Sequence, residues 1–267
     1  MTFLFSRRWV LFAIVVAAAA WGATQLGQWQ FHRLDDRRAQ NAIVARNLAE
    51  PPVPFDDVLA VGAPVRDDEE WRRVTARGTW DDAHTIVLKY QTRNGAAGVD
   101  VVTPLVTDSG TAVLVDRGWM ATDNSGAQRP ETPAVHEGQV TVTGWVRQDA
   151  AGGATQVSDL ATRALSSRAA ADVLPYRLYG GFIDLDKQSP DPLHRLGAHE
   201  LPDDTSEGPH FFYGLQWWFF GALAVFGFLY LAWDERRVRR QALAEVSGSE
   251  GAQESAVDRK HGAGHER

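Results

Sequence analysis

The stretch FFYGLQWWFFGALAVFGFLYLAW, from Phe211 to Trp233, contains 23 consecutive residues without a charged side chain. A helix of this length, at about 1.5 Å per residue, crosses a hydrocarbon core of roughly 30 Å. Its aromatic residues gather at both ends, and Trp and Tyr favour the membrane–water interface. The stretch therefore predicts a transmembrane helix over residues 210–233.

A second uncharged stretch, WVLFAIVVAAAAWGATQL, runs from Trp9 to Leu26 and predicts a first transmembrane helix over residues 9–28. A cleavable signal peptide is the alternative, because Arg7 and Arg8 precede the apolar run and alanines occupy positions 17–20. Either interpretation places the following segment outside the cytoplasm.

The flanking charges predict the orientation of both helices. Positively charged flanks stay in the cytoplasm, and arginines lie before the first helix and after the second, at positions 7, 8, 236, 237, 239 and 240. We therefore expect residues 1–8 and a disordered tail, residues 234–267, in the cytoplasm, and a domain over residues 29–209 outside it. Because few residues precede the first helix, a mitochondrial presequence is not expected, and a bacterial cytoplasmic membrane is the predicted location.

Composition excludes several classes of function. Residues 41–209 hold 15 Lys and Arg against 25 Asp and Glu, a net charge of 15 − 25 = −10, which argues against nucleic acid as a partner. The sequence has no cysteine and two methionines. It therefore offers no Cys nucleophile, c-type haem attachment, iron–sulfur cluster or thioether copper site.

The central region reads as a β domain. Residues 32–50 predict a polar helix or linker that ends at three prolines, Pro51, Pro52 and Pro54. Residues 159–173 suit a helix with Ser158 or Asp159 as its N-cap. The fold class is thus a membrane α+β protein whose outside domain is mainly antiparallel, a curved sheet or small open barrel with one helix. Six segments rich in β-branched and aromatic residues are expected as strands: Trp71–Trp80, Thr85–Gln91, Val99–Val106, Thr111–Arg117, Gln139–Val146 and Arg177–Asp186.

Catalytic motifs are missing from the sequence. It contains no G-x-S-x-G, H-E-x-x-H or Walker pattern, so no catalytic residues are assigned, and scattered Ser, His and Asp residues leave a hydrolase as an alternative without motif support. Four histidines of the central region, His84, His136, His194 and His199, lie mostly near predicted turns and are expected at the surface. The spacing of five between His194 and His199 gives no metal motif.

Two helix faces at the outer ends of the transmembrane helices are candidates for a binding site. His210, Tyr213 and Trp217 share one face of the second helix. On the first helix, a face contains Leu26, Trp29, Gln30 and Arg33. A flat cofactor between these faces would find an iron ligand in His210 and a carboxylate partner in Arg33. The alternatives are an interfacial belt of His, Tyr and Trp and a snorkelling Arg33.

These residues carry a family resemblance. LGQWQFHR (26–33) and HFFYGLQW (210–217) resemble the signatures at the first membrane exit and the second membrane entry of the surfeit-locus family, whose members assist cytochrome c oxidase assembly. Between them, in the family's order, come VTARGTWD (74–81), VVTPL (101–105), VLVDRGWM (113–120) and VTVTGWVR (140–147). Asp116 departs from the pattern, which usually has Asn there, and residues 149–209 match it less well.

The resemblance implies a non-catalytic respiratory-chain assembly factor that acts as a chaperone for haem a insertion into oxidase subunit I. It implies that both helices are retained and that His210 ligates the haem iron, with Trp29, Gln30, Arg33, Tyr213 and Trp217 lining the pocket. Gly78 is expected at a close-packing or bulge position and Arg117–Trp119 in a structural turn. The implied partners are subunit I, membrane lipid and, as a further candidate, haem a synthase. Two alternatives remain: a membrane-tethered scaffold for oxidase assembly that binds no haem, and an anchored hydrolase.

Overall fold

The computed structural model describes residues 2–123, 127–202 and 208–262. It contains two compact units, one formed by Met1–Arg38 with Ser206–Arg267, the other by Ala39–Thr205. We describe each unit by itself.

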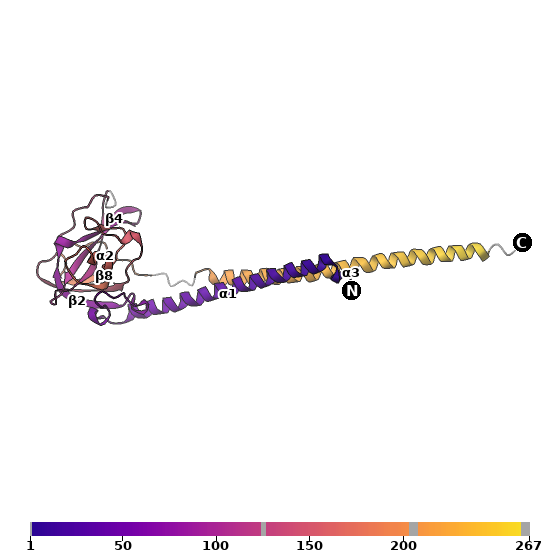
Figure 1. The fold of residues 1–267 in the computed structure, drawn as a ribbon, viewed down its shortest axis with the longest axis horizontal. Coiled ribbons are helices and arrows are strands. Elements are labelled where there is room, and N and C mark those ends of the chain that lie inside the picture. Colours follow the sequence, from indigo (N-terminus) through magenta and orange to yellow (C-terminus); the bar gives the residue numbers. More distant parts are fainter. Residues whose placement is uncertain (1, 124–126, 203–207, 263–267) are drawn as a thin grey trace. The chain divides into compact units, whose positions relative to one another are not determined.

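The first unit is an antiparallel pair of helices, α1 (Arg7–Ala49), most of which belongs to this unit, and α3 (His210–Gly262) (Figure 1). Trp9 near the start of α1 contacts Phe228, and Phe31 further along α1 contacts Phe211 near the start of α3, so the two helices are antiparallel. Both helices are long and apolar enough to cross a membrane. The two predicted apolar helices are therefore present.

Both helices extend beyond their apolar stretches. Helix α1 continues through the polar segment that the sequence predicted as a helix or linker, and it ends at Ala49, just before Pro51. Helix α3 continues to Gly262, whereas the sequence predicted a disordered tail over residues 234–267. Alanine, arginine and glutamate after Trp233 have high helix propensity, which explains this difference.

The second unit is a mixed sheet. Six strands match the predicted segments closely, and two short strands of two residues each were not predicted. The strands are β1 (Val53–Pro54), β2 (Arg73–Trp80), β3 (Ile86–Arg93), β4 (Ala96–Val106), β5 (Ala112–Ala121), β6 (Gln139–Arg147), β7 (Ala161–Thr162) and β8 (Leu178–Ser189).

The sheet closes into a small barrel. Its order is β1-β2-β6-β8-β5-β4-β3-β7, and β2 also pairs with β4, which joins five strands into a ring. The closure consists of two antiparallel pairs, Thr79 with Val106 and Trp80 with Leu105. Gly78 permits this approach, because a Cβ there would lie 2.5 Å from the carbonyl oxygen of Val106. Gly78 thus occupies the close-packing position that its sequence context predicted, and the predicted open barrel is closed at this point.

Alternate residues of β5 face two different cores. Val113 and Val115 belong to a cluster that also contains Val74, Val142 and Ile183. On the opposite face, Ala112 and Leu114 pack with Leu165, Ala170 and Leu178, beneath the short helix. Strand β5 is therefore covered on both faces, which accounts for its nearly continuous apolar sequence. The predicted structural turn over Arg117–Trp119 is wrong, because these residues continue β5.

The short α-helix between β7 and β8, α2 (Ser167–Ala171), is shorter than the predicted segment 159–173. Its N-cap is Ser166, whose hydroxyl accepts from the Ala169 amide, and not Ser158 or Asp159. Asp159 has a φ of +51°, which is incompatible with a right-handed helix. Residues 161–162 form β7 and pair with Val87 and Leu88 instead.

Candidate functional site

His210 is hydrogen-bonded to a residue of the other helix in the first unit. Its Nδ1 lies 2.8 Å from Oε1 of Gln30. An amide oxygen accepts hydrogen bonds, so in this contact Nδ1–H is the donor, and Nε2 makes no contact with Gln30. Two of the six predicted site residues are therefore in direct contact.

Small residues bring the two helices close together near this pair. A Cβ at Gly27 would lie 2.3 Å from the indole ring of Trp218, and one at Gly214 would lie 2.8 Å from the Phe31 ring. Ala23 faces Gly221 in the same way, at 3.2 Å. We call this contact the helix seam. Gln30 and His210 lie at the end of the helix seam nearest the start of α3.

Helical periodicity places most of the other predicted residues on one side of the helix seam. Successive residues of a helix are rotated by about 100° about its axis, so Arg33, three residues after Gln30, lies to one side of it on α1. The same rotation on α3 places Tyr213 to one side of His210 and, because the helices are antiparallel, this is the side on which Arg33 lies. Tyr213 is 47 % exposed, Arg33 is exposed and Trp217 is partly buried. Their side chains therefore border one open flank of the seam.

Trp29 is turned furthest from the helix seam and is 54 % exposed. The predicted face grouped Trp29 with Gln30, but the seam follows Ala23, Gly27 and Gln30, which leaves Trp29 on the outer side of α1. Trp217 lies nearer the seam and stacks edge-on with Phe220, with 6.1 Å between ring centroids. The structure thus connects Gln30 with His210 and places Trp29 apart from them.

An apolar groove of about 480 Å³ lies on the opposite side of the helix seam. Thr24, Trp218 and Phe226 contribute to its lining, together with the small residues Ala20 and Gly221. None of the six predicted residues lines this groove. It offers no ionisable group that could ligate a metal or pair with a carboxylate.

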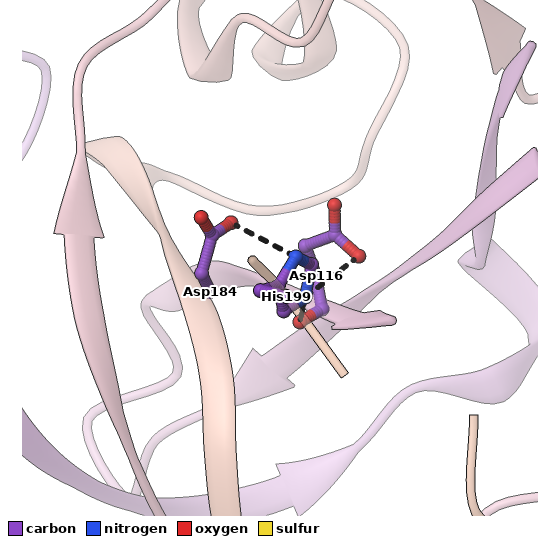
Figure 2. A group of neighbouring side chains, drawn as sticks. All are labelled: Asp116, Asp184 and His199. Carbon is purple, nitrogen blue, oxygen red and sulfur yellow. Dashed lines mark hydrogen bonds and ion pairs between the residues drawn. The ribbon is translucent and has the colours of Figure 1, made fainter. Parts of the chain in front are cut away.

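The second unit holds a separate group of chemically active side chains, Asp116, Asp184 and His199 (Figure 2). His199 Nε2 donates to the backbone oxygen of Asp116 at 3.0 Å and lies 3.4 Å from the Asp116 carboxylate. Its Nδ1 lies 3.9 Å from the Asp184 carboxylate. All three side chains are less than a tenth exposed. The expectation that His199 lies at the surface is therefore wrong.

Charge within this group is only partly compensated. Arg147 contacts Asp184 at 2.7 Å, and Arg93 contacts the neighbouring Asp100 at 2.9 Å. Burial is the main reason that the pKa of Asp116 is well above its ordinary value, and the nearby Asp100 and Asp184 raise it further. Burial also raises the pKa of Asp100, against the opposing charge of Arg93.

Asp116, Asp184 and His199 could in principle share a cation, since one donor atom of each lies within 4.8 Å of the others. Each already has a protein partner, however. Asp116 accepts from the Gly118 amide at 3.0 Å, and Asp184 is held by Arg147. We therefore interpret the group as a buried hydrogen-bonded network that anchors the segment around His199 to β5 and β8.

The sequence contains a signal for this network. Asp116 and Asp184 are single acidic residues within the apolar runs VLVDRGW and FIDL. A charge inside a strand that is covered on both faces is buried and needs a partner.

Comparison with known proteins gives a consistent assignment. The model of the SURF1 family matches residues 17–222. The chain is 30% identical over 250 residues to an uncharacterized SURF1-like protein of Mycobacterium bovis, which covers 91% of this chain and 90% of that protein, and equally to one of Mycobacterium tuberculosis. A SURF1-like protein of Dictyostelium discoideum is 29% identical over 101 residues, 36% of this chain and 37% of that protein.

These matches include the segments 26–33 and 210–217, on which the sequence resemblance rested. They also include residues 149–209, where the motifs were weakest. The predicted resemblance is confirmed over most of the chain. The chain belongs to the SURF1 family.

Proposed function

We propose that this protein is a non-catalytic assembly factor for cytochrome c oxidase that holds haem a between the outer ends of its two transmembrane helices. Membership of the SURF1 family implies a general role in cytochrome oxidase assembly. The finer part of the proposal concerns His210, Gln30 and the residues beside them. Oxidase subunit I is the proposed recipient of the haem, and haem a synthase is a further candidate partner.

The hydrogen bond between His210 and Gln30 carries this proposal. Histidines that ligate metals usually donate their other ring N–H to a protein acceptor, which fixes the tautomer and the orientation of the ring. The 2.8 Å contact from Nδ1 to Gln30 Oε1 supplies such an acceptor and leaves Nε2 for iron. An interfacial histidine that only anchors the helix would not require an acceptor on the neighbouring helix.

The residues bordering the same flank suit a haem by their chemistry. A bound haem a would supply an iron that takes one imidazole ligand, a large apolar ring and two propionates. Arg33 is a suitable partner for a propionate through charge-assisted hydrogen bonds. Tyr213 and Trp217 offer aromatic surface for the macrocycle. Trp29, which is exposed and turned away from the helix seam, would line the outer edge of this flank.

We propose that the helices lie in a bacterial cytoplasmic membrane with both termini in the cytoplasm and the barrel outside. Arginines before α1 and shortly after the apolar part of α3 support this orientation. The long uncharged stretches of both helices support insertion in lipid.

The test is the absorption spectrum of the full-length protein, purified in mild detergent from cells that make haem a. We expect a haem a spectrum for the wild type and its loss in His210→Ala. In Gln30→Leu, haem affinity should fall by roughly 10–100-fold, as for other residues that orient a metal ligand. His194→Ala, an exposed histidine of the barrel unit, is the matched control and should keep the pigment.

A different result would favour the scaffold without haem. If the wild type carries no pigment and cells with His210→Ala assemble active oxidase, haem binding at this site is refuted while a role in assembly stands. If oxidase assembly is normal without the protein, the family-level role fails as well.

A further inference from the structure

A polar pocket of about 370 Å³ lies in the barrel unit beside Arg117 of β5, and is lined by the last part of β8 and by residues that follow that strand. Arg117, Asp186, Lys187, Asp191 and Arg195 are among its lining residues. This volume is at the small end of the range for ligand pockets. The pocket is part of neither the helix seam nor the Asp116 network.

Arg117 is the unusual member of this lining. It is 8% exposed, and no carboxylate in the described residues lies within ion-pair distance of it. Its guanidinium lies 5.9 Å from the centre of the Trp80 ring, a contact that supplies no full negative charge. Burial lowers its pKa, opposed only by the more distant charge of Asp82. A buried cation that no carboxylate contacts is costly, so an anion beside Arg117 would be stabilised.

The neighbouring acidic groups do not supply that charge. Asp186 is engaged by Arg73 at 2.6 Å, and Asp191 contacts Arg195 at 3.4 Å. Lys187 has no acidic partner within the described part of the chain. With these pairs formed, Arg117 and Lys187 are the two uncompensated cations of the pocket, in a region whose net charge is otherwise acidic.

The hydrogen bonds of Arg117 show which of its donors are available. Nη1 donates to the Pro133 oxygen at 3.1 Å and to Thr103 Oγ1 at 3.5 Å, and Nη2 donates to the Ala134 oxygen at 3.4 Å. Within the described residues, Nε–H donates to no acceptor, and Nη2, which has two hydrogens, donates to Ala134 alone. The Nε–H of a guanidinium is parallel to one Nη2–H, and such a pair binds both oxygens of a carboxylate.

We propose that this pocket binds a small-molecule carboxylate, which Arg117 holds by hydrogen bonds and Lys187 attracts by its charge. The ligand neutralises the buried guanidinium and completes its hydrogen bonds. The proposal commits to a carboxylate, whose two oxygens match two parallel donors; inorganic phosphate, which the same donors could bind, is one of the outcomes that the test distinguishes. This site is independent of haem binding, since its residues all belong to the barrel unit.

The experiment is calorimetric titration of the full-length protein in detergent with succinate at low ionic strength, with sodium chloride and inorganic phosphate as comparisons. We expect saturable succinate binding at one site. Arg117→Gln should weaken it by about tenfold or more, because a bidentate charge-assisted contact is lost. Lys187→Gln should weaken it by about threefold, as for an exposed ion pair.

Arg66→Gln is the matched control, because this exposed arginine already pairs with Asp68 and Glu69 outside the pocket. It should bind succinate like the wild type. If Arg117→Gln does not fold, Lys187→Gln decides the matter, because Lys187 is at the surface. Phosphate binding tighter than succinate, equal heat from sodium chloride, or unchanged affinity in Lys187→Gln would overturn the proposal.

Discussion

The pKa of the buried Asp116 carboxyl depends on the charges that surround it. Asp100 on β4 and Asp184 on β8 raise its pKa beyond the effect of burial, whereas the Gly118 amide and Arg93 act in the opposite direction. Because the raised pKa belongs to the folded state, the folded protein holds a proton that the unfolded chain releases near pH 3.9. The free energy of unfolding therefore falls as pH rises from about 3.9 toward the folded-state pKa.

Replacing Asp116 by Asn should remove this dependence. The amide keeps an oxygen to accept from Gly118 but cannot ionise, so His199, Asp184 and Arg147 remain around a neutral group. We expect stability to vary less with pH above about 4 and to increase at pH 7 by roughly 1–3 kcal/mol, the cost of an uncompensated buried polar group. Thermal unfolding between pH 4 and 8 measures both effects.

The control for this variant is Asp108→Asn, which changes an exposed carboxylate in the turn between β4 and β5. It should leave the pH profile almost unchanged. Equal slopes for Asp116→Asn and the wild type would contradict a raised pKa at Asp116.

At the scale of elements, α2 depends on a residue outside it. Asp149, which follows β6, accepts from the amide of Ser167 and from its hydroxyl, both at 2.6 Å. Asp149→Ala should therefore leave the amide and hydroxyl of Ser167 without this acceptor, while the Ser166 cap remains, and cost about 1–2 kcal/mol. Urea unfolding of the full chain measures the loss. Asp172→Ala at the other end of α2 is the control, and an equal loss there would argue against the capping role.

The elements also show where sequence reasoning succeeds. Strands such as β2 and β6 are alternating or apolar runs between turn residues, so their positions could be predicted within a few residues. The length of α2 could not, because its start is set by Asp149 and by the pairing of β7 with β3. Local propensity in the segment DLATRALSSRAAADV favours a longer helix than tertiary contacts allow.

The candidate site, too, could be predicted only in part. Helical spacing placed His210 with Tyr213 and Gln30 with Arg33, because spacing within one helix is fixed. The contact of Gln30 with His210 depends on how α1 and α3 face each other, which is set by glycines such as Gly27. The network of Asp116, Asp184 and His199 joins residues far apart in the sequence, and only the fold brings them together.

At the scale of the whole molecule, the absence of cysteine makes the membrane orientation easy to test. Single cysteines can replace Ser109, exposed in the β4–β5 turn, Ser6 before α1, and Ala242 in the exposed part of α3. With an impermeant maleimide on intact cells, we expect Ser109→Cys to be labelled more than about tenfold faster than the other two, since the bilayer excludes the charged reagent. After lysis, all three cysteines should be labelled at similar rates. Labelling of Ala242→Cys in intact cells would contradict a cytoplasmic C-terminus.

The short end strands of the sheet affect how readily copies of the barrel unit associate through their strand edges. Long unpaired strand edges recruit strands from other molecules and lead to aggregation. Here both end strands, β1 and β7, have two residues each. The longer edge of β3 is interrupted by a bulge next to Lys89, where the register shifts between Leu88 and Gln91. A domain without disulfides thus offers little continuous strand edge to its neighbours, so we expect little edge-to-edge association between copies of the barrel unit.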